Sequence, residues 1–127
     1  MLDGIESITT AALGLALDVA SQRQQVIAAN IANANTVGYV PQRLNFSEQI
    51  EDVQRSLKAG QPLDAYALAA FQARLTPVLD AGGQPGKVQL DEEVAALSQN
   101  SVQYQALIKG LNRHFSILGM AASDGKR

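Results

Sequence analysis

The chain has 127 residues, 46% of them hydrophobic but only six of them aromatic, which suits one domain with a modest core. Ten lysines and arginines against twelve aspartates and glutamates give a net charge of −2 without a basic block, which argues against nucleic acid as a partner. Cysteine is absent, so disulfides, thiolate metal sites and cysteine nucleophiles are excluded.

The first predicted element is an N-terminal helix over residues 1–35, whose apolar residues form two rows. One row contains Leu13, Leu17, Ala20, Ile27 and Ile31, and the other contains Ile8, Ala12, Leu15, Val19 and Val26. At about 100° per residue, Leu13 and Leu15 point roughly 160° apart, so one partner helix cannot cover both rows. The second row must pack on the middle of this chain or on a neighbouring molecule, and the sequence leaves both open.

The N-terminal segment also bears on the membrane and on secretion. Its longest apolar run, residues 11–17, is far shorter than the roughly 20 residues that span a bilayer. Asp3 and Glu6 precede the first cation, Arg23, whereas a secretory signal begins with a basic region. We therefore expect neither a transmembrane helix nor a cleaved signal peptide.

The helix runs into the stretch IAANIANANTVGYVP, residues 27–41, which places three asparagines within six residues. Asparagine is a poor residue for a helix interior, but its amide bonds free backbone groups where a helix ends. Gly38 can adopt a positive φ, and Pro41 prevents the helix from resuming. We predict a compact turn that packs against another element. Its expected functional residues are Asn30, Asn33, Asn35, Thr36, Gly38 and Tyr39.

The middle of the chain, residues 36–89, predicts this turn, a short helix and an irregular connector. Residues 46–57 have apolar helical spacing, with Asn45 as a candidate cap, and Gly60 and Pro62 end the run. Two short extended pieces, 76–79 and 87–90, flank the turn sequence DAGGQPG and predict a hairpin. Residues 64–75 are ambiguous between helix and irregular structure.

The last predicted element is a C-terminal helix over residues 90–122. Its apolar residues follow alternating steps of four and three, which is typical of a coiled-coil seam. Asp91 is the expected N-cap, and Glu92 and Glu93 form a charge pair in the first turn. The expected packing seam comprises Leu13, Leu17, Ile27 and Ile31 of the first helix and Val94, Leu97, Tyr104, Ile108, Leu111, Phe115 and Leu118 of the second, with Ser101 as an interruption.

These elements predict a mainly α fold in which the long N- and C-terminal helices of a single domain, residues 1–127, pair as a coiled coil. The sequence offers few candidate residues for catalysis. The single histidine, His114, lies near a helix end and is interpreted as solvated or capping, and adjacent Glu92 and Glu93 diverge by about 100°. We expect no catalytic, cofactor or metal site, and an enzyme is the least favoured hypothesis.

Two stretches resemble a known family. The run RQQVIAANIANANTVGY, residues 23–39, resembles the signature of flagellar rod and hook axial proteins, Ala-Asn-x-x-Asn-x-x-Thr-x-Gly-Tyr, which closes their first long helix. The run VQLDEEVAALSQNSVQYQALIKGLNRHFSILGMA, residues 88–121, is similar to their paired terminal helix, and most similar to the proximal rod members. The resemblance covers residues 1–47 and 87–122, with departures at Val37 and Pro41.

The resemblance to the bacterial flagellar basal-body rod protein family implies a structural subunit that polymerises through its terminal helices into the proximal part of the drive shaft. The implied partners are further copies of the chain, other rod proteins, a rod-base adaptor, the inner-membrane ring and the flagellar type III export apparatus. The implied location is the periplasmic rod of the basal body, reached without a cleaved signal peptide. The alternative is an export adaptor or helical-bundle partner of another flagellar axial protein.

Overall fold

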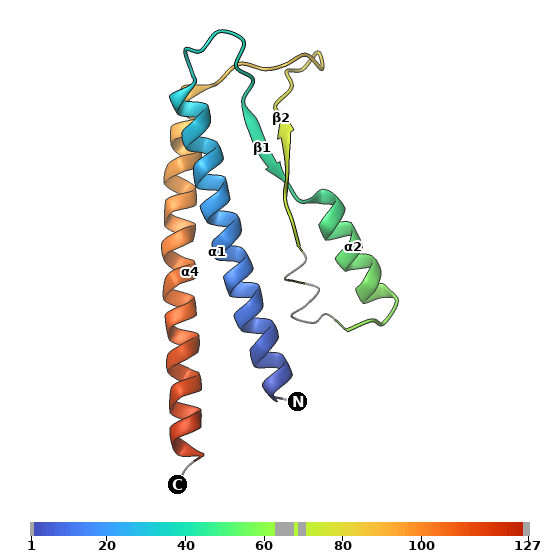
Figure 1. Ribbon diagram of the computed structural model, residues 1–127, viewed down its shortest axis with the longest axis vertical. Helices are drawn as coiled ribbons and strands as arrows, with labels where there is room; N and C mark the ends of the chain where they lie inside the picture. The colour runs from blue at the N-terminus through green and yellow to red at the C-terminus, as the bar shows by residue number, and fades with distance from the viewer. Residues whose placement is uncertain (1, 63–67, 69–70, 126–127) are drawn as a thin grey trace.

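The computed structural model describes residues 2–62, 68 and 71–125, and two long helices dominate it (Figure 1). Helix α1 spans Leu2–Ala32 and helix α4 spans Leu90–Asp124, and the two run antiparallel and side by side. The prediction of a mainly α fold with paired terminal helices is therefore confirmed. Among the described residues, no helix combines the length and apolar character needed to cross a membrane.

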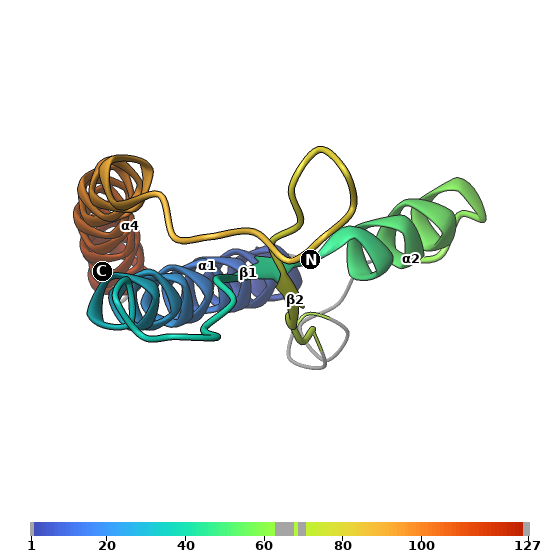
Figure 2. The ribbon, with the colours of Figure 1, turned by 90° about the horizontal axis from the view of Figure 1, so that it is seen from above.

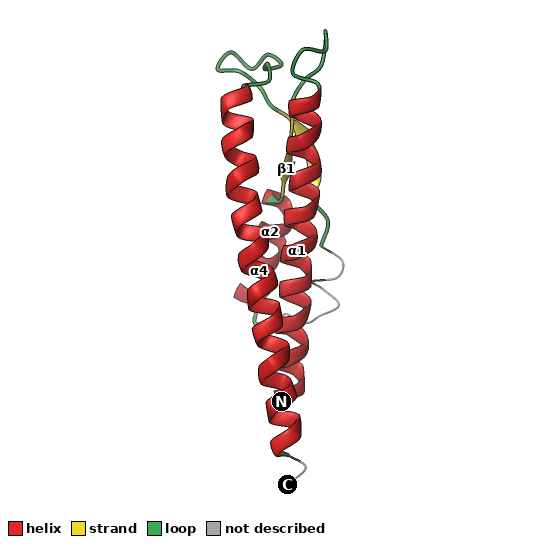
Figure 3. Ribbon diagram, turned by 90° about the vertical axis from the view of Figure 1, so that its left-hand side faces the viewer, coloured by secondary structure: helices red, strands yellow, loops and turns green. Residues whose placement is uncertain are grey.

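The middle of the chain supplies strand β1 (Gln42–Asn45), helix α2 (Ser47–Lys58) and strand β2 (Arg74–Pro77). Seen from above, α4, α1 and this middle unit follow one another in a row (Figure 2), and from the α4 side the strands and α2 lie behind the helix pair (Figure 3). Helix α1 is thus the central layer. It has a partner on each of two faces.

The predicted short helix is present as α2. Phe46 rather than the expected Asn45 occupies the N-cap position, without a side-chain cap bond, and the Asn45 Oδ1 atom accepts a hydrogen bond from the Ser47 N–H at 2.9 Å. Gly60 follows the helix with a φ of +75°, a conformation that glycine adopts without steric cost. The C-terminal helix differs from the prediction at its start. Residue Gln89 occupies the N-cap position without a side-chain hydrogen bond, and Asp91 lies inside the first turn.

The two strands form an antiparallel ribbon that the sequence did not predict. Gln42 pairs with Pro77 and Asn45 with Arg74, so residues 74–77 pair with β1 rather than with 87–90. The expected hairpin is reduced to one isolated bridge between Leu79 and Pro85. The extended character of 42–45 is hidden in the sequence because this segment directly follows the turn, and it becomes a strand only through its partner.

The middle unit faces the second apolar row of α1. Phe46 stacks on Phe71 with ring centroids 5.6 Å apart, and the guanidinium carbon of Arg23 lies 5.9 Å from the Phe46 ring centroid. Leu68 is buried, with 8% of its surface exposed. The apolar cavity of about 330 Å³ between these elements is lined by residues that include Leu15, Val19, Ile50 and Leu107. The chain's own middle therefore covers part of the second row.

Candidate functional site

The turn is held by a buried asparagine near the end of α1. Asn30 is fully buried, and its Oδ1 atom accepts hydrogen bonds from the Tyr39 hydroxyl at 2.8 Å and from the Gln42 N–H at 3.0 Å. Its Nδ2 atom donates to the Gln42 carbonyl at 3.0 Å and to Oε2 of Glu93 at 3.2 Å. The carboxamide therefore pairs with both backbone groups of Gln42, as a neighbouring strand would.

Glu93 completes this cluster from α4. Only 1% of its surface is exposed, and its second carboxylate oxygen pairs with the Arg43 guanidinium, whose side chain is 42% exposed. Arg43 also donates from Nη1 to the Gln42 carbonyl at 3.0 Å. A buried carboxylate is tolerated only with such partners. The interpretation of Glu93 as half of an N-terminal charge pair is thus corrected, and we call Asn30, Tyr39, Gln42, Arg43 and Glu93 the turn clasp.

The turn beyond Asn30 is built from short local hydrogen bonds. Asn33 donates from Nδ2 to the Ala29 carbonyl at 2.8 Å and accepts from the Thr36 hydroxyl at 3.1 Å. The Tyr39 N–H then bonds the Thr36 carbonyl at 3.2 Å, across Gly38 with a φ of +79°. The structure therefore brings together five of the six predicted turn residues. Asn35 is exposed at the edge of this network.

The seam between the helices differs from the predicted one on α4. In α1, Ile27 is buried and Leu13, Leu17 and Ile31 are partly buried, and in α4 the residues Leu97, Leu111 and Leu118 are partly buried. By contrast, the exposed fractions of Val94, Tyr104, Ile108 and Phe115 are 48%, 39%, 37% and 49%. The expectation that Val94, Ile108 and Phe115 pack on α1 of the same chain is corrected, whereas Tyr104 lines a pocket together with Ala20 and Gln24 of α1. Three polar residues make hydrogen bonds across the interface instead. They are Glu93, Asn100 and His114, which directly precede Val94, Ser101 and Phe115.

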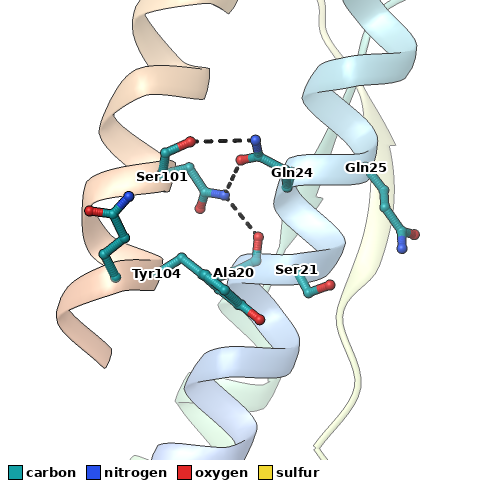
Figure 4. A pocket seen from close by; sticks show the side chains of 8 residues that line it. Ala20, Ser21, Gln24, Gln25, Ser101 and Tyr104 are labelled. Atoms are coloured by element: carbon teal, nitrogen blue, oxygen red, sulfur yellow. Dashed lines mark hydrogen bonds between the residues drawn. The ribbon is translucent and has the colours of Figure 1, made fainter. Parts of the chain in front are cut away.

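One of these polar residues is Asn100, in the middle of α4 and only 2% exposed. Its Nδ2 atom donates to the Ala20 carbonyl at 2.8 Å and to Oε1 of Gln24 at 2.7 Å, while its Oδ1 atom has no hydrogen-bond partner. Figure 4 shows the surrounding pocket, where Gln24 reaches Ser101 at 3.5 Å. The pocket has a volume of about 370 Å³, and its lining includes Ser21, Gln25, Tyr104 and Gln105.

His114 is the other unexpected contact. It is partly buried, and its Nε2 atom lies 3.1 Å from the Thr10 hydroxyl oxygen across the helix pair, which corrects its interpretation as a solvated or capping residue. Glu93, Asn100 and His114 share a spacing in multiples of seven, and this spacing was the signal that the sequence offered for them. Within the described ranges, no three histidine, aspartate or glutamate side chains are grouped to hold a metal ion.

Comparison with known proteins finds relatives of this chain. Residues 12–39, which contain Asn30 and the turn, match the family model described as flagella basal body rod protein. The chain is also 32% identical over 114 residues to the flagellar basal body rod protein FlgB of Escherichia coli (strain K12), covering 76% of this chain and 80% of that protein. The chain belongs to the flagellar basal body rod protein family.

Other relatives agree with this assignment. Identity to the Aeromonas hydrophila FlgB is 31% over 108 residues, covering 80% of this chain and 82% of the relative. Identity to the Bacillus subtilis (strain 168) FlgB is 28% over 116 residues, covering 87% and 90%. The family resemblance seen in the sequence is therefore confirmed, and it extends well beyond the turn.

Proposed function

We propose that this protein is a structural subunit of the flagellar basal-body rod and polymerises through its terminal helices into the proximal part of the drive shaft. The observation that carries the proposal is an exposed apolar row on α4. Val94, Ile108 and Phe115 lie at intervals of 14 and seven residues and expose between 37% and 49% of their surface. A row with this period, running along about 30 Å of helix, suits a partner that is itself a helix.

The other half of the proposal rests on family membership. Relatives of similar length are rod proteins by name. We infer from this that the partners are copies of this chain, other rod proteins, a rod-base adaptor, the inner-membrane ring and the type III export apparatus. The inferred location is the periplasmic rod, reached without a cleaved signal peptide. The turn residues Asn30, Asn33, Asn35, Thr36, Gly38 and Tyr39 would shape the end of each subunit, and catalysis plays no part in this role.

Substitution in the exposed row tests the proposal. Ile108→Glu is expected to leave the isolated subunit folded, since the side chain is exposed there, but to remove it from rods because a carboxylate would be buried against the neighbouring helix. The matched control is Val102→Glu, on another face of α4 and 67% exposed, which should assemble. Immunoblots of cytoplasm, periplasm and purified basal bodies, together with swimming assays, report both results.

The same fractions separate the proposal from its alternative. A rod subunit co-purifies with basal bodies in a fixed ratio to the other rod components, whereas an export adaptor stays in the cytoplasm or at the export apparatus. Absence of the unmodified chain from purified basal bodies would contradict the structural role. Equal incorporation of Ile108→Glu and Val102→Glu would show that the exposed row does not make the assembly contact.

A further inference from the structure

Helix α4 carries two overlapping heptad rows, of which the inner one faces α1 and the outer one is largely exposed, apart from Ser101, which Gln24 of α1 reaches. Both rows can pair with the shared residues Leu97, Tyr104, Leu111 and Leu118. The inner row, one position before the outer row, contains Glu93, Asn100, Leu107 and His114. The outer row contains Val94, Ser101, Ile108 and Phe115. Because the shared residues lie between the two rows, a rotation of α4 by about 50° would exchange one seam for the other.

Burial of apolar surface favours the row that is left outside. The outer row has three large apolar side chains and the inner row only one, and each square ångström of apolar surface removed from water contributes about 25 cal/mol. Hydrophobicity alone would therefore turn the outer row towards α1. The structure has the opposite orientation, with Val94, Ile108 and Phe115 exposed. Another interaction must set the rotation.

The polar members of the inner row supply that interaction. Glu93 bonds Asn30 and Arg43, and His114 meets Thr10. These contacts lie towards opposite ends of the helix pair, and each would be lost if α4 rotated.

Asn100 lies between these two contacts and has the most restrictive partner. It donates to the backbone carbonyl of Ala20 at 2.8 Å, an atom fixed in the middle of α1 that cannot follow a rotating helix. Its second acceptor, Oε1 of Gln24 at 2.7 Å, lies one turn further along α1. The two bonds together define both the height and the rotation of α4 at this point.

We propose that Asn100, supported by Glu93 and His114, determines the rotation of α4 on α1 and thereby keeps the outer row exposed for assembly. The second part of this statement rests on the proposed function. A buried carboxamide is less stabilising than an apolar side chain of similar size, because its polar atoms leave water. A single buried asparagine that fixes helix orientation at the expense of stability is an established device in coiled coils.

Thiol labelling can measure the rotation, because the chain has no cysteine of its own. Two single variants are compared, Leu107→Cys in the inner row, partly buried, and Ile108→Cys in the outer row, 37% exposed. With Asn100 in place, the thiol of the Ile108→Cys variant should react faster than that of the Leu107→Cys variant. When Asn100→Leu is added to each, we expect the rate of the Ile108→Cys variant divided by that of the Leu107→Cys variant to fall by roughly fivefold, the effect of about one net hydrogen bond. Asn100→Ala, which cannot overfill the site, should shift the ratio in the same direction.

The matched control is Asn112→Leu, the same substitution at an exposed position of α4, which should leave the ratio unchanged. An unchanged ratio in both Asn100 variants would overturn the proposal. So would an equal rise of both rates with loss of circular-dichroism signal, since that reports unfolding rather than rotation. Because labelling is done on the isolated chain, it is independent of the rod. A fallen ratio combined with normal incorporation into basal bodies would refute the link to assembly while leaving the proposed function intact.

Discussion

At the residue scale, Asn30 shows why this position requires a side-chain amide, which both donates and accepts hydrogen bonds. All of its hydrogen-bonding partners are on the protein, two for Oδ1 and two for Nδ2. Two of the four are the N–H and carbonyl of Gln42, and the others come from Tyr39 and Glu93. An aspartate has nearly the same shape but cannot donate when ionised. The site therefore discriminates between two isosteric residues by charge and by donors.

Asn30→Asp is expected to destabilise the subunit by roughly 2 to 4 kcal/mol, because it removes the amide donor to the Gln42 carbonyl and sets two carboxylates against each other. The deficit should shrink on acidification, since protonating one carboxylate removes the repulsion and restores a donor. Urea denaturation across a pH series measures both effects. The control is Asn35→Asp, at an exposed position, and a deficit as large as that of Asn30→Asp would contradict the role of the turn clasp.

At the element scale, the helix pair depends on the row that both possible seams share. Leu111 belongs to this row and is partly buried, whereas Arg113 lies exposed two residues later. A change at Leu111 therefore acts on pairing whichever way α4 is rotated. A change at Arg113 alters only solvated charge.

Leu111→Asp is expected to lower the free energy of unfolding by about 2 to 4 kcal/mol, because a carboxylate in a largely apolar contact must be solvated or protonated. Arg113→Ala should change it by less than about 0.5 kcal/mol. Urea midpoints of the two purified variants and the parent chain provide the comparison. Similar midpoints for both variants would mean that the helices are not held together at Leu111.

The sequence predicts the helices, the turn and the short α2 because each depends on local period or local chain chemistry. Prediction from the sequence fails where two packing arrangements of one helix have the same heptad spacing. The 4–3 spacing of α4 fits two rows equally and apolar content favours the outer one, whereas contacts from α1 to Glu93 and Asn100 select the inner one. Strand β1 escapes prediction for a related reason, because its pairing with β2 joins residues as many as 35 positions apart, Gln42 and Pro77.

At the scale of the whole molecule, the buried core is small, and most of it lies between the middle of the helix pair and the turn. Among the described residues, the buried apolar side chains are Ala20, Ile27, Pro41 and Leu68, and the buried polar ones are Asn30, Glu93 and Asn100. Helix α2 has no buried residue, and the last turns of α4 beyond Leu118 are exposed. Stability should therefore be distributed unevenly along the chain.

Amide hydrogen exchange is expected to follow this distribution. Amides in residues 20–30 and 93–100 should exchange slowest, while those of α2 and of residues 119–124 should exchange early, because local opening there exposes little apolar surface. Exchange followed by mass spectrometry at neutral pH resolves these segments. Equal protection of α2 and the centre of α1 would show that the middle unit is anchored more firmly than its packing indicates.

The position of the two chain ends gives the subunit different mechanical responses to different loads. Both termini lie at one end of the helix pair and the turn lies at the other (Figure 1). Pulling the termini apart would break the cross-helix contacts one after another, first His114 with Thr10, then Asn100 with Ala20, and last Glu93 with Asn30. A load that slides one helix along the other would strain all three at once. The same contacts therefore resist shear far better than peeling, so the helix pair is strongest when force runs along the helices.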